Sequence, residues 1–134
     1  MRNNRAEAFE TRLAEALGDI DSMLEARFGQ TFARHPVRPA QGQTAKPQYD
    51  GLFSLIANYT AGFGSRFGHG YTLSLQVATL APVPESLRRE WEAFAAEQLR
   101  RRLPALFPNR HLAVDLDVHG WKLHGDLSLD NDDE

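Results

Sequence analysis

The sequence predicts an α+β fold of two layers, in which two amphipathic helices cover one face of a four-stranded antiparallel sheet. Apolar residues recur every three or four positions in two segments, and they alternate with polar residues in two others that each contain a turn. These segments follow one another in the order α-β-β-α-β-β. With 134 residues, the chain fits one domain spanning residues 1–134.

The first helix is expected from Asn3 to about Phe28. Gly18 lies inside it and costs about 1 kcal/mol relative to alanine, so a kink or break could occur there. Because the apolar stripe stays in phase across Gly18, a continuous helix is favoured. The stripe consists of Phe9, Leu13, Leu17, Ile20, Leu24 and Phe28.

An irregular connection is expected over residues 29–50, which contain Pro36, Pro39 and Pro47 and no sustained apolar period. A loop of this length is unusual in a compact domain. It is either a disordered linker or a functional arm, and the sequence favours neither.

The first hairpin is expected from alternating apolar and polar residues in 53–60 and in 71–80. Between these strands lies the glycine-rich loop, residues 62–70, with the sequence GFGSRFGHG. Pro82 and Pro84 end the second strand, and Pro84 can begin a helix that runs to about Pro104.

The second hairpin is indicated by a change of phase, since apolar residues occupy even positions from Leu112 to Val118 and odd positions from Trp121 to Leu127. A two-residue turn at His119 and Gly120 would bring all of them to one face. The expected pairs on that face are Val118 with Trp121, Leu116 with Leu123, Val114 with Gly125 and Leu112 with Leu127. On the other face, Asp117 is expected opposite Lys122 and Asp115 opposite His124.

Composition excludes several classes of protein. The absence of cysteine removes disulfides, thiolate nucleophiles and cysteine-bound metal sites. No apolar run reaches the roughly 18 residues needed to cross a bilayer, and the charged start does not resemble a signal peptide, so we expect a cytoplasmic protein without membrane contact. Residues 130–134 form an acidic tail.

Ser65, Arg66, His69 and Tyr71 are candidate ligand-binding residues, because the glycine-rich loop could present amides, a hydroxyl and a cation to an anion. The loop matches neither phosphate-binding glycine pattern and joins two strands. It also lacks the GxSxG pattern of a serine nucleophile, so we expect no catalytic residues. The alternative is a plain hairpin connection with Phe63 and Phe67 folded inward.

Two further kinds of site receive less support. Arg100, Arg101, Arg102 and Arg110 could contact nucleic acid, with Arg34, Arg38 and Arg66, but cations in the last turn of a helix also complement its dipole. Residues 111–134 hold Lys122 against seven carboxylates, which would repel a polyanion, so nucleic acid is not expected. The side chains Asp115, Asp117, His124 and Asp126, with His111 and His119, match no known metal site, and we expect no metal or cofactor.

The outer face of the first hairpin carries no charge, although exposed sheets usually carry Lys or Glu as protection against association. A second copy, a partner protein or residues 29–50 could cover this face. The sequence therefore favours a non-enzymatic binding or interaction domain, expected to be a homodimer, over a small ligand-binding protein or enzyme or a weak nucleic-acid binder. The expected interface residues are Ser54, Ile56, Asn58, Thr72, Ser74 and Gln76.

Overall fold

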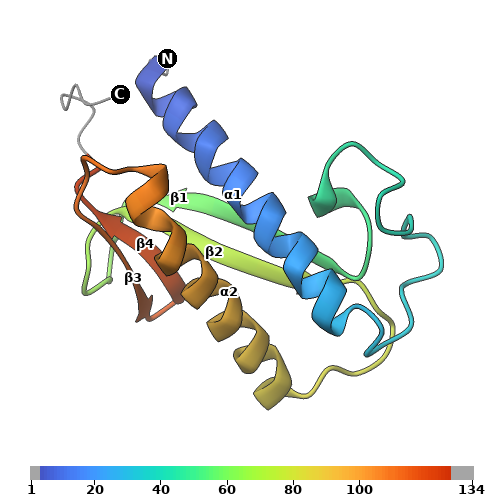
Figure 1. The fold of residues 1–134 in the computed structure, drawn as a ribbon. Helices are drawn as coiled ribbons and strands as arrows, with labels where there is room; N and C mark the ends of the chain where they lie inside the picture. The colour runs from blue at the N-terminus through green and yellow to red at the C-terminus, as the bar shows by residue number, and fades with distance from the viewer. Residues whose placement is uncertain (1–3, 128–134) are drawn as a thin grey trace.

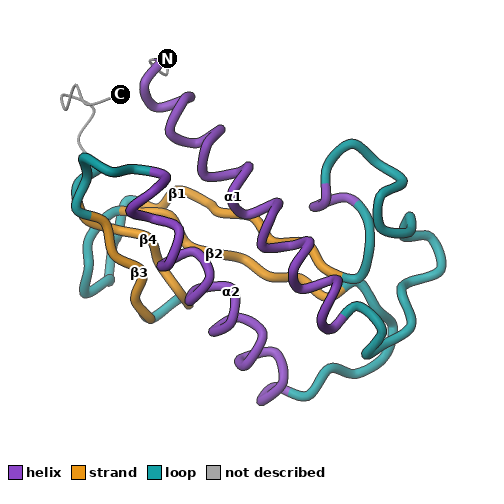
Figure 2. Tube along the Cα trace, viewed as in Figure 1, coloured by secondary structure: helices purple, strands orange, loops and turns teal. Residues whose placement is uncertain are grey.

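The computed structural model describes residues 4–127 and confirms the predicted fold class. Both helices lie on one face of a four-stranded antiparallel sheet (Figures 1 and 2). The elements are α1 (Asn4–Phe28), the short 3-10 helix η1 (Pro47–Tyr49), β1 (Phe53–Thr60), β2 (Gly70–Val77), α2 (Glu85–Leu106), β3 (Leu112–Asp117) and β4 (Gly120–Gly125). The expected acidic tail lies outside the described residues.

The strand order is β1-β2-β4-β3, so the two hairpins meet between β2 and β4. In the first hairpin Phe53 pairs with Val77 and Thr60 pairs with Gly70. β2 ends at Val77, three residues before the predicted end at residue 80, and Ala78 then bonds through its backbone to Leu52 and His35. β2 and β4 pair at only two positions, Tyr71 with Leu123 and Thr72 with Lys122.

The second hairpin forms, but the predicted register is wrong by two residues. Asp117 pairs with Gly120, so Val118 and His119 form the turn in place of His119 and Gly120. Gly120 nevertheless has a positive φ of 114°. A shift of two residues keeps every side chain on its predicted face. The observed pairs include Val114 with Leu123, Leu116 with Trp121, Leu112 with Gly125 and Asp115 with Lys122.

The structure confirms the predicted continuity of the first helix and corrects the predicted end of the second. α1 runs through Gly18 without interruption. α2 continues past Pro104 to Leu106, which corrects the predicted end. A proline this close to the end of a helix removes one backbone hydrogen bond and leaves the preceding turns intact. Arg100, Arg101 and Arg102 therefore lie before the last turn of α2, which contains no basic residue.

The hydrophobic core lies between the helices and the sheet. Trp91 of α2 is almost fully buried and meets Phe53 edge-on at 5.1 Å between ring centroids. Phe9 of α1 stacks on Phe107 just after α2, at 4.4 Å. The largest fully buried apolar side chains are Trp91, Phe53, Leu13, Leu17, Ile20, Leu24, Leu52, Leu99, Leu123 and Val114.

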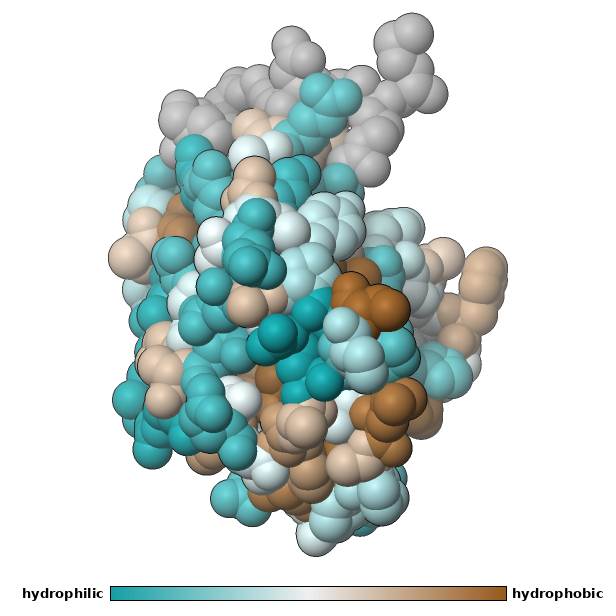
Figure 3. Space-filling model, turned by 90° about the vertical axis from the view of Figure 1, so that its right-hand side faces the viewer, coloured by the Kyte–Doolittle hydropathy of each residue, from teal (hydrophilic) through white to brown (hydrophobic). Residues whose placement is uncertain are grey.

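Residues 29–50 form a folded arm beside α1 and the start of β1, seen at the right of Figure 1. The guanidinium of Arg38 fixes the arm by donating hydrogen bonds of 3.0 to 3.1 Å to four backbone carbonyls. Figure 3 views the molecule from this side and shows hydrophobic residues in separate groups among hydrophilic ones. The acceptors of Arg38 are Gln48, Asp50, Gly51 and Phe53.

Candidate functional site

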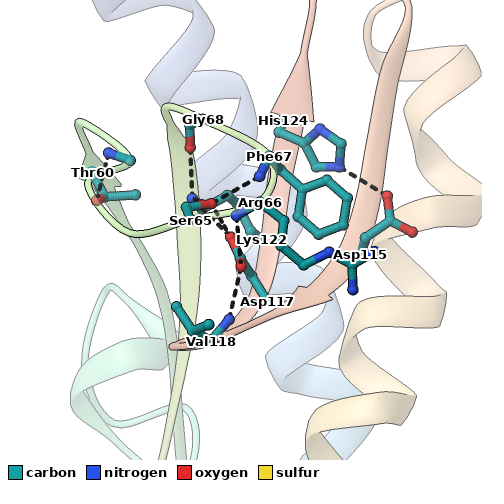
Figure 4. Close-up of polar contacts among 11 residues, drawn as sticks. Thr60, Ser65, Arg66, Phe67, Gly68, Asp115, Asp117, Val118, Lys122 and His124 are labelled. Atoms are coloured by element: carbon teal, nitrogen blue, oxygen red, sulfur yellow. Dashed lines mark hydrogen bonds and ion pairs between the residues drawn. The ribbon is translucent and has the colours of Figure 1, made fainter.

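The glycine-rich loop folds back over the outer face of β3 and β4, which is the face away from the helices (Figure 4). Three of its glycines, Gly62, Gly64 and Gly68, have positive φ angles of 76° to 90°. A Cβ on Gly62 would lie 2.2 Å from the carbonyl carbon of Gly68, so the two ends of the loop approach each other too closely for a side chain. This close approach directs the centre of the loop toward the second hairpin.

Gly70 provides the space through which Lys122 reaches the loop. A Cβ on Gly70 would lie 2.4 Å from the carbonyl oxygen of Leu123 and 3.2 Å from the Lys122 stem. The methylene chain of Lys122 occupies this space, and its side chain is 4% exposed. A glycine at the first position of β2 is therefore required both by the sheet and by the lysine.

Lys122 and the loop form a closed polar cluster. An ammonium group has three protons to donate. The Nζ of Lys122 donates to the Oγ of Ser65 at 2.7 Å and to the carbonyl of Gly68 at 2.7 Å, and it lies 3.1 Å from Oδ2 of Asp117. Each proton of the buried ammonium thus has an acceptor.

Asp117 accepts hydrogen bonds from most of the remaining donors of this cluster. Its side chain is 2% exposed, and it accepts hydrogen bonds from the hydroxyl of Ser65 and from the Val118 amide at 2.8 Å. A weaker contact of 3.4 Å reaches the Arg66 amide. The Ser65 hydroxyl is the main cause that lowers the pKa of Asp117 below its usual range, with the Val118 amide and Lys122 acting in the same direction.

This geometry favours an anchor for the loop over a nucleophile or an anion site. The hydroxyl hydrogen of Ser65 goes to Asp117, and its oxygen accepts from Lys122 and from the Phe67 amide. An activated serine would instead donate its hydrogen to a general base while its oxygen faced a substrate. Asp117 also holds the position that an external phosphate would take, so such a ligand would have to displace this carboxylate.

A second contact between the loop and the hairpin involves His124. The ring of Phe67 stacks on that of His124 at 4.4 Å, and Nε2 of His124 lies 2.8 Å from Oδ2 of Asp115. Phe67 is thus half-buried, as the alternative interpretation of the loop expected, whereas the inward position expected for Phe63 is wrong because this side chain is 91% exposed. Within residues 4–127 no three His, Asp or Glu side chains are arranged to hold a metal ion.

The four predicted ligand-binding residues lie in two places. Ser65 and Arg66 adjoin Asp117 on the outer face, where Arg66 is exposed. His69 and Tyr71 line a cavity of about 350 Å³ at the first turns of α1. In that cavity the buried Tyr71 donates a 2.8 Å hydrogen bond to Glu10.

The predicted interface residues do share one surface. Strand alternation places them on the outer face of β1 and β2, with Ile56 opposite Ser74 and Asn58 opposite Thr72. Neither helix covers this face (Figure 1), and Asn58 and Gln76 are exposed. The structure thus brings together Ser54, Ile56, Asn58, Thr72, Ser74 and Gln76.

The candidate basic cluster is engaged in contacts within the chain. Arg100 and Arg101 both pair with Glu97, and Arg100 also donates to the carbonyl of Val114 in β3. Arg102 donates to Gln98, one turn earlier in α2. The three arginines therefore hold α2 through these contacts and, contrary to what the sequence had suggested, do not cap its C-terminal end.

Sequence reasoning missed a second polar cluster, where α1 meets the start of β1. Oε2 of Glu25 accepts the Phe53 amide at 2.8 Å, and Oδ2 of Asp21 accepts the Leu55 amide at 3.1 Å. Asp21 is 1% exposed and its Oδ1 has no hydrogen-bond partner among the described residues. Burial is the main cause that raises the pKa of Asp21 to about 8, and burial also raises the pKa of Glu25.

The sequence did contain a signal for this cluster. Asp21 lies four residues after Leu17 and three before Leu24, so it falls on the apolar stripe of α1. An acid within such a stripe indicates a buried carboxylate with backbone donors nearby.

Comparison with known proteins gives a family but no activity. Residues 4–125 match the model of a family described as "Uncharacterised protein". The chain belongs to this family. An "Uncharacterized protein" of Borreliella burgdorferi (strain ATCC 35210 / DSM 4680 / CIP 102532 / B31) is 34% identical over 125 residues, which cover 93% of this chain and 98% of the relative. No solved structure matches the chain, and within residues 4–127 no helix is long and apolar enough to cross a membrane.

Proposed function

We propose that the protein is a non-enzymatic interaction domain of the cytoplasm that forms a homodimer through the outer face of β1 and β2. The observation that supports this proposal is the contrast between the two halves of that face. The β3–β4 half carries Asp115, Asp117, Lys122 and His124 and lies under the glycine-rich loop. The β1–β2 half has no charged side chain and no helix over it.

A second copy of the chain is the partner that fits an uncharged face. Around a two-fold axis each residue meets the same region of the partner, so a charged face would place like charges close together. Ser, Asn, Thr and Gln side chains can donate and accept hydrogen bonds and are therefore self-complementary.

Ser74→Lys tests the proposal, because Ser74 lies on the outer face opposite Ile56 and is not part of the core. An unpaired lysine buried in a dimer should weaken association strongly and leave the monomer folded. Sedimentation velocity at micromolar concentration measures the mass, and circular dichroism checks the fold. Ala93→Lys, at an exposed position of α2, is the matched control and should remain dimeric.

Two results would contradict the proposal. One is a wild-type protein that is already monomeric at micromolar concentration. The other is a Ser74→Lys variant that stays dimeric like the control.

A further inference from the structure

β1 is an edge strand, and its free edge is only partly covered. Phe53 and Leu55 direct their amides away from β2, and the carboxyl groups of Glu25 and Asp21 accept hydrogen bonds from these amides. The carbonyl oxygen of Phe53 on the same edge accepts a hydrogen bond from the guanidinium of Arg38. The first half of the edge is therefore capped by side chains of α1 and the arm.

The second half of this edge is open. Because backbone groups of a strand alternate in direction, the amides and carbonyls of Ala57 and Tyr59 point the same way as those of Phe53 and Leu55. Among residues 4–127, neither the Ala57 amide nor the Tyr59 amide has a hydrogen-bond partner. An uncapped edge of this kind can pair with another extended chain.

A cavity of about 360 Å³ lies along the open edge. Five consecutive residues of β1, 55–59, line it. Successive side chains of a strand point to opposite faces, so a cavity lined by a consecutive run must lie at the strand's edge, beside the backbone. The α1 side of the cavity presents Leu13, Ala14, Leu17 and Glu10.

We propose that this groove between α1 and β1 binds an extended peptide segment with basic side chains, which adds to the sheet as a strand beside Ala57 and Tyr59. The backbone of the segment would exchange hydrogen bonds with both residues. Alternate side chains would point toward α1, where apolar ones would meet the exposed Ala14 above the buried Leu13 and Leu17. Long basic ones would extend past these leucines to the carboxylates of α1.

The charge of the groove determines the choice of partner. Two further cavities adjoin the first, since one shares Glu10 and Tyr59 with it and the other shares Ala14 and Gln48. Among the described residues that line the three cavities, the carboxylates Glu10, Glu15 and Asp19 stand against one lysine, Lys46. A second copy paired edge to edge would bring two such acidic walls together, which disfavours it.

The first test uses a short synthetic peptide in which threonine alternates with valine and lysine. Ala57→Pro removes the outward amide, and an edge strand tolerates proline there because the bonds to β2 come from the neighbouring residues. Fluorescence anisotropy should show binding to the wild type and a loss of about tenfold or more in the variant. Ala57→Val keeps the amide and is the matched control. Equal binding to Ala57→Pro and wild type, or no binding to wild type, would overturn the proposal.

A second variant tests the charge without altering the backbone. Glu15→Lys combined with Asp19→Lys should weaken binding of the lysine peptide and strengthen binding of the same peptide with glutamate in place of lysine. Glu85→Lys combined with Glu90→Lys, at two exposed positions of α2, makes the same change of net charge and should alter the affinity for either peptide only slightly. If the groove variant and the α2 control change the affinity for the peptides equally, the net charge of the protein attracts the peptide and the groove does not.

Hydrogen exchange separates the peptide from a second copy. The Ala57 and Tyr59 amides should become protected when the peptide is added, at a fixed protein concentration. Protection that instead rises with protein concentration, without peptide, would assign the edge to a second copy and contradict the proposal. The outer-face dimer is a separate proposal, because Ser74 lies on the sheet's face and not at this edge.

Discussion

The side chains of Asp21 and Asp117 both have little contact with solvent, yet their pKa values move in opposite directions. Asp21 is 1% exposed and the Asp117 side chain 2% exposed. Among the described residues, the Leu55 amide is the one hydrogen-bond donor to Asp21, and burial raises the pKa of Asp21 to about 8. Asp117 has the Ser65 hydroxyl, the Val118 amide and a cation, and its pKa is lowered. Burial with a single donor thus raises the pKa of Asp21, whereas several donors and a cation lower the pKa of Asp117.

The same difference separates two junctions of the molecule. At the α1–β1 junction the carboxyls of Asp21 and Glu25 cap strand amides beside Asp50, with Arg38 as the nearby cation. At the loop–hairpin junction one carboxylate, one ammonium and one hydroxyl satisfy one another. The first junction should therefore lose stability as its carboxyls ionise, and the second should lose stability as its carboxylate is protonated.

Asp21→Asn should produce the largest change. In the unfolded chain Asp21 ionises near pH 3.8, whereas in the folded protein it stays protonated to about pH 8. The folded state thus binds the extra proton, and wild-type stability should fall between these values by about 1.4 kcal/mol per pH unit. Asparagine keeps the acceptor for Leu55 and cannot ionise, so the variant should be several kcal/mol more stable than wild type above pH 8.

Urea denaturation from about pH 4 to pH 9 measures this difference. Asp19→Asn, at an exposed position of the same helix, is the control and should follow the wild-type curve. If the difference in the free energy of unfolding between Asp21→Asn and wild type stays constant across this pH range, Asp21 is ionised in the folded protein. The opposite pKa shifts of Asp21 and Asp117 would then be contradicted.

Lys122→Met should produce the next largest effect. Methionine keeps an apolar stem beside Gly70 but leaves Asp117 buried without its cation. Breaking a buried pair in this way is strongly destabilising, and we expect Tm to fall by about 10 °C. Lys46→Met, on the exposed arm, removes the chain's other lysine and should leave Tm within about 2 °C of wild type. If Lys122→Met also changes Tm by only about 2 °C, the polar cluster of Lys122, Ser65 and Asp117 does not stabilise the loop.

The fold could be predicted because each element carries its own period. Alternation assigned the strands, and the phase change after Val118 assigned the faces of the second hairpin. The register could not be determined in the same way, because a shift of two residues leaves every side chain on the same face. Side-chain contacts between Asp117 and Lys122 and between Asp115 and His124 form as expected, but diagonally, with Asp115 and Lys122 as the paired residues.

The candidate site was less predictable because its members come from distant parts of the chain. Ser65 was selected from the glycine-rich loop, but its partners Asp117 and Lys122 lie 52 and 57 residues away. No local pattern specifies that such a loop folds back onto β4. The end of α2 was misjudged for a different reason, since Pro104 was interpreted as a stop although the helix continues two residues past it to Leu106.

Ser65→Ala should give the smallest effect and shows whether the hydroxyl acts through Asp117. The variant removes the main donor to Asp117 and an acceptor of Lys122, so stability at neutral pH should fall by about 1 to 2 kcal/mol. A carboxyl with a lowered folded pKa contributes stability that is present above its unfolded pKa and is lost as the pH falls through the folded one. The difference in the free energy of unfolding between variant and wild type should therefore keep its full size above about pH 4 and become smaller below that pH.

The control is Ser22→Ala, at an exposed position of α1, whose free energy of unfolding should differ from that of the wild type by the same amount at every pH. A difference that stays constant down to about pH 2 would mean that Ser65 stabilises the loop by packing alone, independently of the charge on Asp117.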